Sequence, residues 1–270
     1  MYSKKVSVDE MAGLIDHTNL KPFATRKKIK ELCEEAVEHK FAAVCVNTSY
    51  VDLCSKVLKK TDVAVAAVIG FPLGSCTTKT KAFETKEAVN FGAQEIDMVL
   101  NIGTFYDEDY SYIKNDIKRV VKAADGAIVK VILETGYLTD EQIIKACQIV
   151  KEAEAHFVKT STGFGPMGAF VDHVSLMRQT VGDNFGLKAA GGIKDAKTAV
   201  RMVNAGANRL GASAGITIID SLRKTIDEGK WFDSEGDSPE KIYSWGAADP
   251  KKQPKKIYDF YIQKKEKFLK

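Results

Sequence analysis

Residues 128–160 read IVKVILETGYLTDEQIIKACQIVKEAEAHFVKT. The stretch opens with a short apolar run at 128–134, continues through a segment whose apolar residues recur at helical spacing at 139–154, and closes with a second apolar run at 157–160. Apolar runs with so few polar interruptions indicate strands buried on both faces, as in parallel sheets covered by helices. The stretch therefore predicts a strand, a helix and a second strand parallel to the first.

The same unit repeats along the chain. Eight strand-like runs begin 27, 22, 32, 33, 29, 28 and 24 residues apart, at 14–17, 41–46, 63–71, 95–101, 128–134, 157–160, 185–189 and 209–212. Each interval holds one helix-sized segment, such as 25–39 or 79–90. Eight such units close into a (β/α)8 barrel of about 250 residues. An open doubly wound sheet is the alternative, but the GxGxxG fingerprint of that fold is absent after the first strand.

We therefore expect an α/β fold, a single TIM barrel over residues 1–228 with a C-terminal helical extension at 229–270. Residues 229–254 have the composition of an irregular segment, and apolar residues then recur at helical spacing among lysines at 257–269. This pattern predicts an amphipathic basic helix that packs on the barrel or on another subunit. A tether to a membrane surface or to nucleic acid is the less favoured alternative.

The composition indicates a folded protein of the cytoplasm. Hydrophobic residues make up 44% of the chain and charged residues 28%, which is typical of globular domains. No apolar run approaches the roughly 18 residues that cross a bilayer, and the N-terminal residues lack the apolar centre of a signal peptide. The five cysteines are scattered and odd in number, which fits a reducing compartment better than a disulfide framework.

The charge distribution argues against nucleic acid as the main partner. The formal net charge is +4, but residues 251–270 alone carry a net of +6, so the other 250 residues carry a net of −2. Nucleic-acid binding needs a basic face on the folded domain itself. Neither nucleic acid nor a membrane is therefore an expected partner.

Two lysines lie inside otherwise apolar strands. Lys159 follows Val158 in the sixth run, and Lys188 follows Leu187 in the seventh. One such lysine alone reads most simply as a side chain that extends outward to water. Two in successive strands indicate a pair, because a second cation and desolvation together lower the pKa of a lysine amine. An uncharged lysine amine attacks carbonyl carbons to form a Schiff base.

Two carboxylates lie at the ends of other strands, Asp16 in the first and Asp97 in the fourth. Reacting groups of a (β/α)8 barrel collect where the strands end, so these carboxylates could serve in acid–base steps beside a lysine or a water. A buried ion pair between Asp97 and Lys188 is a structural alternative that is compatible with this role. Thr18 lies at the end of the first strand and Cys45 lies inside the second. Cys45 either lines the pocket or is a small core residue.

Glycines near the last two strands predict an anion site. Gly191 and Gly192 follow the seventh strand, and residues 211–215 run from the end of the eighth strand into the start of the last helix. Free backbone N–H groups at such turns and helix N-termini favour phosphate, although turns also use glycine for its conformation alone. The four histidines are dispersed without metal-binding spacing, so no metal and no organic cofactor is expected.

The sequence resembles the deoxyribose-phosphate aldolase family over residues 14–222. The resemblance rests on LIDHTNLKP, VCVN, VIGFPLG, EIDMVLNIG, KVILETG, VKTSTGF, KAAGGI and GAS. It implies a metal-free enzyme that interconverts 2-deoxy-D-ribose 5-phosphate with D-glyceraldehyde 3-phosphate and acetaldehyde through a lysine Schiff base. We expect Lys159 to attack the carbonyl of the sugar phosphate and the C3–C4 bond of the sugar to break.

The resemblance assigns roles to individual residues. Lys159 would be the nucleophile, Lys188 would lower its pKa and share in proton transfer, and Asp97 and Asp16 would complete the proton relay. The phosphate would lie on backbone groups of Gly163, Gly191, Gly192, Ser213 and Ala214.

The chain departs from the family pattern at several positions. Ala214 stands where a second serine is frequent, and Phe170 stands where a threonine is frequent. Some family members bring a terminal tyrosine to the site, and Tyr258 or Tyr261 would be the counterpart here.

Other functions stay open at this point. A phosphosugar isomerase or synthase on the same barrel would use the phosphate loops without Lys159. A non-catalytic binding or assembly paralogue is a further alternative. A homodimer or a higher homo-oligomer is also compatible with the sequence.

Overall fold

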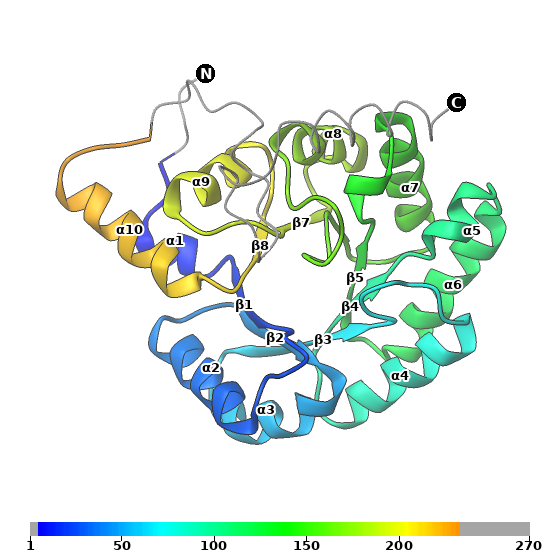
Figure 1. The fold of residues 1–270 in the computed structure, drawn as a ribbon, viewed down its shortest axis with the longest axis horizontal. Coiled ribbons are helices and arrows are strands. Elements are labelled where there is room, and N and C mark those ends of the chain that lie inside the picture. The colour runs from blue at the N-terminus through cyan, green and yellow to red at the C-terminus, as the bar shows by residue number, and fades with distance from the viewer. Residues whose placement is uncertain (1–4, 233–270) are drawn as a thin grey trace.

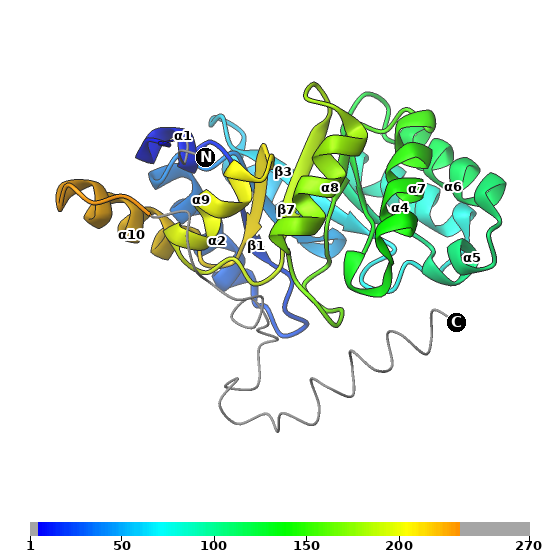
Figure 2. The same cartoon turned by 90° about the horizontal axis from the view of Figure 1, so that it is seen from above.

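The computed structural model describes residues 5–232, and within them eight parallel strands form a closed barrel. Each strand pairs with the next along the chain, and the last pairs with the first. The helices surround the ring of strands (Figures 1 and 2). The predicted (β/α)8 barrel is confirmed. The strands are β1 (Ile15–Asn19), β2 (Ala43–Asn47), β3 (Ala64–Ile69), β4 (Glu95–Val99), β5 (Ile128–Ile132), β6 (Phe157–Lys159), β7 (Gly186–Ala190) and β8 (Arg209–Ala212).

The helices follow the strands in the order that the sequence predicts, and the segments 25–39, 79–90 and 139–154 correspond to α2, α4 and α7. The α-helices are α1 (Val8–Ala12), α2 (Arg26–Glu38), α3 (Val51–Leu58), α4 (Thr78–Asn90), α5 (Ile102–Tyr106), α6 (Tyr110–Ala123), α7 (Asp140–Glu152), α8 (Val171–Val181), α9 (Ala196–Asn204) and α10 (Gly215–Asp227). Two short 3-10 helices are η1 (Thr48–Tyr50) and η2 (Thr135–Tyr137).

Side chains at the helix starts explain where several helices begin. The Thr25 hydroxyl accepts a hydrogen bond from the backbone of Lys28 at the start of α2. Thr139 and Gln142 form a reciprocal capping box at the start of α7. Such caps satisfy backbone N–H groups that the helix itself leaves unpaired, and each stabilises its helix by about 1 kcal/mol.

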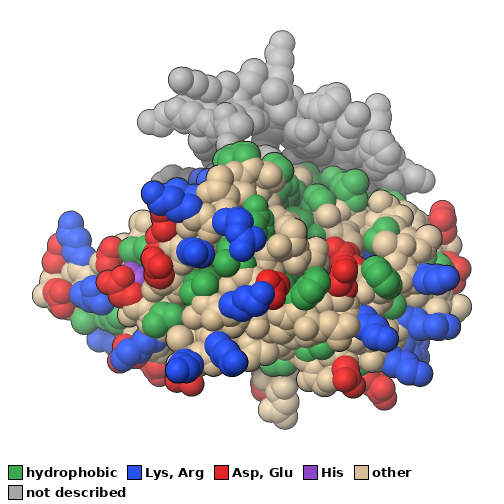
Figure 3. Space-filling model, turned by 90° about the horizontal axis from the view of Figure 1, so that it is seen from below, with side chains coloured by type: hydrophobic (Ala, Val, Ile, Leu, Met, Phe, Trp, Pro, Cys, Tyr) green, Lys and Arg blue, Asp and Glu red, His purple; other side chains and the backbone are tan. Residues whose placement is uncertain are grey.

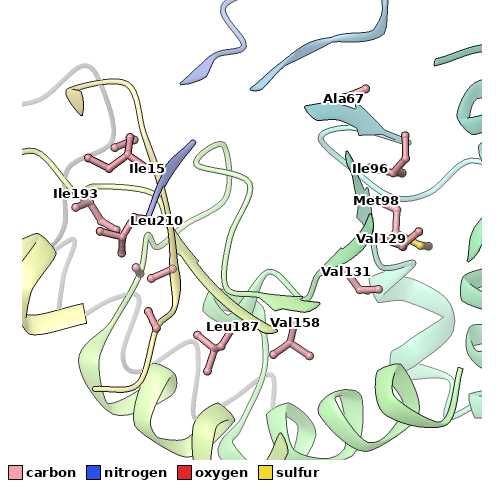
Figure 4. Packing of buried hydrophobic residues seen from close by; sticks show 14 of the residues in the cluster. Ile15, Ala67, Ile96, Met98, Val129, Val131, Val158, Leu187, Ile193 and Leu210 are labelled. Carbon is pink, nitrogen blue, oxygen red and sulfur yellow. The ribbon is translucent and has the colours of Figure 1, made fainter. Parts of the chain in front are cut away.

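Alternate strand residues face two different environments. Outward-facing side chains pack between the strands and the surrounding helices (Figure 4), among them Ile15, Ile96, Met98, Val131, Val158, Leu187 and Leu210. The inner faces of β2 and β3 carry small or β-branched residues, namely Ala43, Cys45, Ala66 and Val68. Because these inner residues are small, the barrel interior has room for long polar side chains from the other strands.

Two short helices are absent from the sequence prediction. α1 precedes the first strand, and α5 shares the interval between β4 and β5 with α6. Each is five residues long, which is too short for apolar periodicity to reveal a helix.

α10 ends at Asp227, next to the predicted domain boundary at residue 228. Trp231 and Phe232 pack against the barrel core. The rest of the predicted extension, including Tyr258 and Tyr261, lies outside the described residues. The division of the chain into a barrel and an extension stays a prediction.

The surface of the described residues carries mixed charges. On the face seen in Figure 3, Lys and Arg side chains are interspersed with Asp and Glu side chains rather than gathered on one side. No helix within residues 5–232 is long and apolar enough to span a membrane.

Candidate active site

Seven charged side chains meet inside the barrel. They are Asp16 from β1, Glu95 and Asp97 from β4, Lys130 from β5, Lys159 from β6, Lys188 from β7 and Arg209 from β8. Strand alternation turns these side chains inward, and the register brings them level with one another. Asp97 pairs with Lys130 across β4 and β5, and Lys159 pairs with Lys188 across β6 and β7.

Asp97 joins the two lysines that the sequence predicted. Lys159 Nζ and Lys188 Nζ each lie 2.8 Å from the same oxygen, Asp97 Oδ2. Lys188 also forms an ion pair with Asp16. Lys159 is 3% exposed, and the other three side chains are fully buried. The structure therefore brings all four residues together in one cluster, and the predicted ion pair between Asp97 and Lys188 is present.

Three further residues extend the cluster toward the amino ends of the strands. Lys130 Nζ lies 2.7 Å from Asp97 Oδ1 and 2.5 Å from Glu95 Oε2. Arg209 contacts Asp16 Oδ1 at 2.6 Å and Glu95 Oε1 at 3.0 Å. Each carboxylate therefore faces more than one cation.

Sequence reasoning missed Lys130, Glu95 and Arg209. Glu95 lies two residues before Asp97, so period-two alternation already places both on one face of β4. Lys130 has the same context as Lys159, a lysine between β-branched residues of a strand. The signal was present, but a polar residue in a strand can face the barrel interior or the helix layer, and only the register decides.

A count of charges shows how this cluster can be buried. Burying ions without compensation costs several kcal/mol per ion. Three carboxylates, those of Asp16, Glu95 and Asp97, face four basic side chains. The cluster is electrically neutral if one basic group is uncharged. Arginine stays protonated in proteins, so a base of this cluster that loses its proton is one of the three lysines. Glu134, a further buried carboxyl group, interacts electrostatically with Lys159 from outside the cluster.

The three lysines of the cluster differ in the direction of their pKa shifts. Burial lowers the pKa of Lys159, and Lys188 acts in the same direction, whereas Asp97 opposes both. Burial also acts to lower the pKa of Lys188, but Asp16 and Asp97 outweigh it and raise that pKa. The pKa of Lys130 is raised as well, because the carboxylates led by Asp97 outweigh burial. Lys159 is therefore the amine of the cluster that most readily loses its proton.

The carboxylates stay ionised. Burial acts to raise the pKa of Asp97, but Lys130, Lys159 and Lys188 outweigh it and hold the pKa well below its usual range. The pKa of Asp16 is lowered in the same way, by Lys188, Lys130 and Arg209 against burial.

Thr18 and Cys45 are register partners across β1 and β2, one step beyond Asp16 toward the carboxyl ends of the strands. The Thr18 hydroxyl donates a hydrogen bond to the Asp16 carbonyl at 2.8 Å. Cys45 is buried, belongs to the small apolar cluster of the barrel interior, and interacts electrostatically with Lys188, Asp97 and Lys159. Burial raises the pKa of the Cys45 thiol, so it is a neutral group on the wall of the charged cluster.

The predicted phosphate residues lie in the turns after β6, β7 and β8. Gly163, Gly191 and Gly192 have φ values of 83°, 91° and 78°, which favour glycine. A Cβ atom on Gly191 would lie 3.5 Å from the Gly163 Cα, so the first two turns are in contact. Ser213 and Ala214 precede α10, where Ala214 is the N-cap. None of these five residues donates its backbone N–H to a backbone or side-chain acceptor within residues 5–232.

The site therefore places a lysine amine of lowered pKa beside a carboxylate and a second lysine, where active sites of (β/α)8 barrels lie. This arrangement suits an aldolase that forms a Schiff base. The sequence model of the DeoC/LacD family of aldolases matches residues 10–221, and the chain belongs to this family.

Relatives with known descriptions agree with this assignment. A deoxyribose-phosphate aldolase of Thermoanaerobacter sp. (strain X514) is 57% identical over 217 residues, which cover 79% of this chain and 97% of that protein. One of Clostridium tetani is 57% identical over 215 residues, covering 79% of this chain and all of that protein. The solved structure of the tetrameric deoxyribose phosphate aldolase of Aeropyrum pernix is 31% identical, with a TM-score of 0.76, over 80% of this chain and 92% of that one.

Proposed function

We propose that this aldolase cleaves 2-deoxy-D-ribose 5-phosphate reversibly to D-glyceraldehyde 3-phosphate and acetaldehyde, with Lys159 as the nucleophile. The observation that carries the mechanism is the shared contact of Lys159 and Lys188 with Asp97 Oδ2, in a cluster that is neutral when Lys159 is uncharged. Relatives at 57% identity over most of the chain support the choice of substrate.

The reaction begins with attack of the uncharged Lys159 amine on the C1 aldehyde of the open-chain sugar. The resulting carbinolamine loses its hydroxyl as water, and Lys188 supplies the proton that this step needs. The Lys159 nitrogen then carries the positive charge of an iminium, and Lys188 is neutral. One charge has moved between two nitrogens beside the same Asp97 oxygen, so the buried cluster stays balanced.

The neutral Lys188 is the base for bond cleavage. It accepts the proton of the C3 hydroxyl, directly or through a water, while the C2–C3 bond breaks and its electrons move toward the iminium. The products fix this bond, because acetaldehyde takes C1 and C2 and glyceraldehyde 3-phosphate takes C3 to C5. The assignment to C3–C4 made from the sequence is therefore wrong.

The enamine that remains on Lys159 is then protonated at C2 by Lys188. Water attacks the new iminium, the proton released by that water returns to Lys188, and acetaldehyde leaves. Asp97 and Asp16 hold Lys188 in place throughout, and they stabilise its charged form in the steps where it carries the proton. No metal or organic cofactor takes part in this scheme, because the iminium itself accepts the electrons.

The phosphate group binds in the turns after β6, β7 and β8 in this proposal. The free N–H groups of Gly163, Gly191, Gly192, Ser213 and Ala214 supply donors, and the N-terminus of α10 favours an anion. The change to Ala214 is tolerated because a backbone donor needs no hydroxyl. Thr18 and Cys45 would contact the other end of the substrate.

Reductive trapping tests the nucleophile. The protein is treated with sodium borohydride in the presence of 2-deoxyribose 5-phosphate, and the modified peptide is located by mass spectrometry. We expect an irreversible adduct on Lys159 and loss of acetaldehyde release in a coupled assay. An adduct on Lys130 or Lys188 in place of Lys159 would overturn the assignment.

The proposal places the enzyme in the cytoplasm as a homo-oligomer. The five cysteines are free thiols, which suits a reducing compartment. The relative from Aeropyrum pernix is described as tetrameric, and large apolar side chains such as Leu73 and Phe83 are exposed on this protomer.

A further inference from the structure

Glu134 is a buried carboxyl group beside the active site that the mechanism above does not use. It lies two residues after β5 and is 2% exposed. Its backbone has φ 53° and ψ 59°, a left-handed conformation that residues with side chains adopt rarely and at a cost. Such strain persists where the surrounding structure enforces it, and often at functional sites.

Contacts with β6 enforce this conformation. The backbone N–H of Leu133 donates to the Lys159 carbonyl, and that of Thr135 donates to the Thr160 carbonyl, both at 2.9 Å. The residues on either side of Glu134 are therefore tied to the strand end that carries the nucleophile. The Glu134 side chain extends toward the loop that follows β6.

The Glu134 carboxylate holds the turn of that loop. Its Oε2 atom accepts a hydrogen bond from the Thr162 backbone N–H at 3.2 Å and a second from the Thr162 hydroxyl. The Thr162 hydroxyl oxygen in turn accepts from the Phe164 N–H at 2.9 Å. These bonds fix the residues on both sides of Gly163, whose own N–H is free within the described part of the chain.

The loop is shaped to receive this carboxylate. A Cβ atom on Gly165 would lie only 2.6 Å from Glu134 Cδ and 2.7 Å from Glu134 Oε1. Glycine at position 165 therefore leaves the space that the carboxylate occupies. Burial raises the pKa of Glu134, although the hydrogen bonds from Thr162 and the nearby Lys159 act in the opposite direction. The carboxylate is therefore buried here at an energetic cost.

We propose that Glu134 is a positioning residue that sets the preference for a phosphorylated substrate, by holding Thr162 and thereby aiming the Gly163 N–H at the phosphate. The inference rests on the proposed function and assigns to it a specificity determinant that does not touch the substrate. Loss of the Glu134–Thr162 bonds leaves Lys159 able to react but lets the turn at Gly163 move.

The test compares two substrates in three variants. Thr162→Val removes the hydroxyl that links Glu134 to Phe164, and Glu134→Ala removes the acceptor. We expect KM for 2-deoxyribose 5-phosphate to rise about tenfold in both, with kcat changed about threefold or less, since a displaced donor costs about one hydrogen bond. For 2-deoxyribose, which lacks the phosphate, kcat/KM should not change. Glu134→Gln keeps an acceptor oxygen and should restore most of the affinity.

Thr135→Val is the matched control. Thr135 adjoins Glu134, is equally buried, and its hydroxyl has no hydrogen-bond partner within the described residues. It should leave both KM values unchanged. Equal losses on the two sugars in Thr162→Val, or no loss on either, would overturn the role of Glu134.

Phosphate binding separates the inference from the proposed function. If the unmodified enzyme released acetaldehyde from neither sugar, the proposed function would fail. The affinity for inorganic phosphate, measured by calorimetry, would then still decide the role of Glu134. Binding about tenfold weaker in Thr162→Val than in Thr135→Val supports it, and equal binding refutes it.

Discussion

The two amines that contact Asp97 Oδ2 differ in charge because of what else each one meets. Lys188 contacts two carboxylates, whereas Lys159 contacts one. Sequence alone could reach both lysines, since each interrupts an apolar strand shortly before a glycine. Sequence alone could not assign their charges, because the balance of charge in the cluster also depends on Lys130, Glu95 and Arg209. The inward orientation of these three side chains follows from the barrel register.

Opposite changes of charge beside Lys159 should move its pKa in opposite directions. Lys188→Met removes a cation, so the pKa of Lys159 should rise and the amine should react only at higher pH. Asp97→Asn removes an anion, so that pKa should fall. The measurement is the pH dependence of acetaldehyde trapping on Lys159 by cyanoborohydride, which reports Schiff-base formation. We expect the two profiles to lie on opposite sides of the wild-type profile, each by about one pH unit or more.

Turnover provides the second readout for these variants. Both should lower kcat/KM for 2-deoxyribose 5-phosphate by about 10²- to 10⁴-fold, because proton transfer is impaired in each. Profiles displaced in the same direction would contradict the balance of charges in the barrel.

At the scale of elements, the sequence predicted all eight strands to within a few residues, because apolar runs and their spacing are local properties. It did not predict at which strand positions a neighbouring strand leaves room only for a small side chain. Gly211 in β8 is such a residue, since a Cβ atom there would lie 2.9 Å from Ala190 Cβ and 3.0 Å from Lys188 Cε. The close approach of β7 and β8 is visible only in three dimensions.

Gly211→Ala should therefore displace Lys188 and strain the contact between β7 and β8. We expect a loss of about 1–3 kcal/mol in the free energy of unfolding, as for other overpacked cores, measured by urea denaturation. Activity should fall as well, because Lys188 moves relative to Asp97.

Gly103→Ala is the control for this prediction. Its Cβ atom would have only the Asn101 side chain near it, at 3.8 Å, on an exposed turn of α5. It should be neutral or slightly stabilising. Equal stability of the two variants would show that β7 and β8 yield freely at Gly211.

At the scale of the whole molecule, the barrel encloses a set of ions that must stay paired. The carboxylates of Asp16 and Asp97 have lowered pKa values in the fold, against a model-peptide value of about 3.8. The unfolded chain therefore binds more protons than the native protein at acid pH. The stability that these groups contribute is fully present above about pH 4 to 5 and is lost as the pH falls toward their folded pKa values.

Acid unfolding should reveal this contribution. We expect the thermal midpoint of the wild-type protein to fall steeply below about pH 4. The free energy of unfolding should drop by about 1.4 kcal/mol for each unit by which a pKa differs between the folded and unfolded states. Asp97→Asn should be less stable at pH 7, because it leaves buried cations less well paired, but its midpoint should depend less on pH below 4. Glu34→Gln removes an exposed carboxylate on α2 and should keep the full wild-type slope. Parallel curves for Asp97→Asn and the wild type would mean that acid unfolds the protein through surface groups and not through the barrel interior.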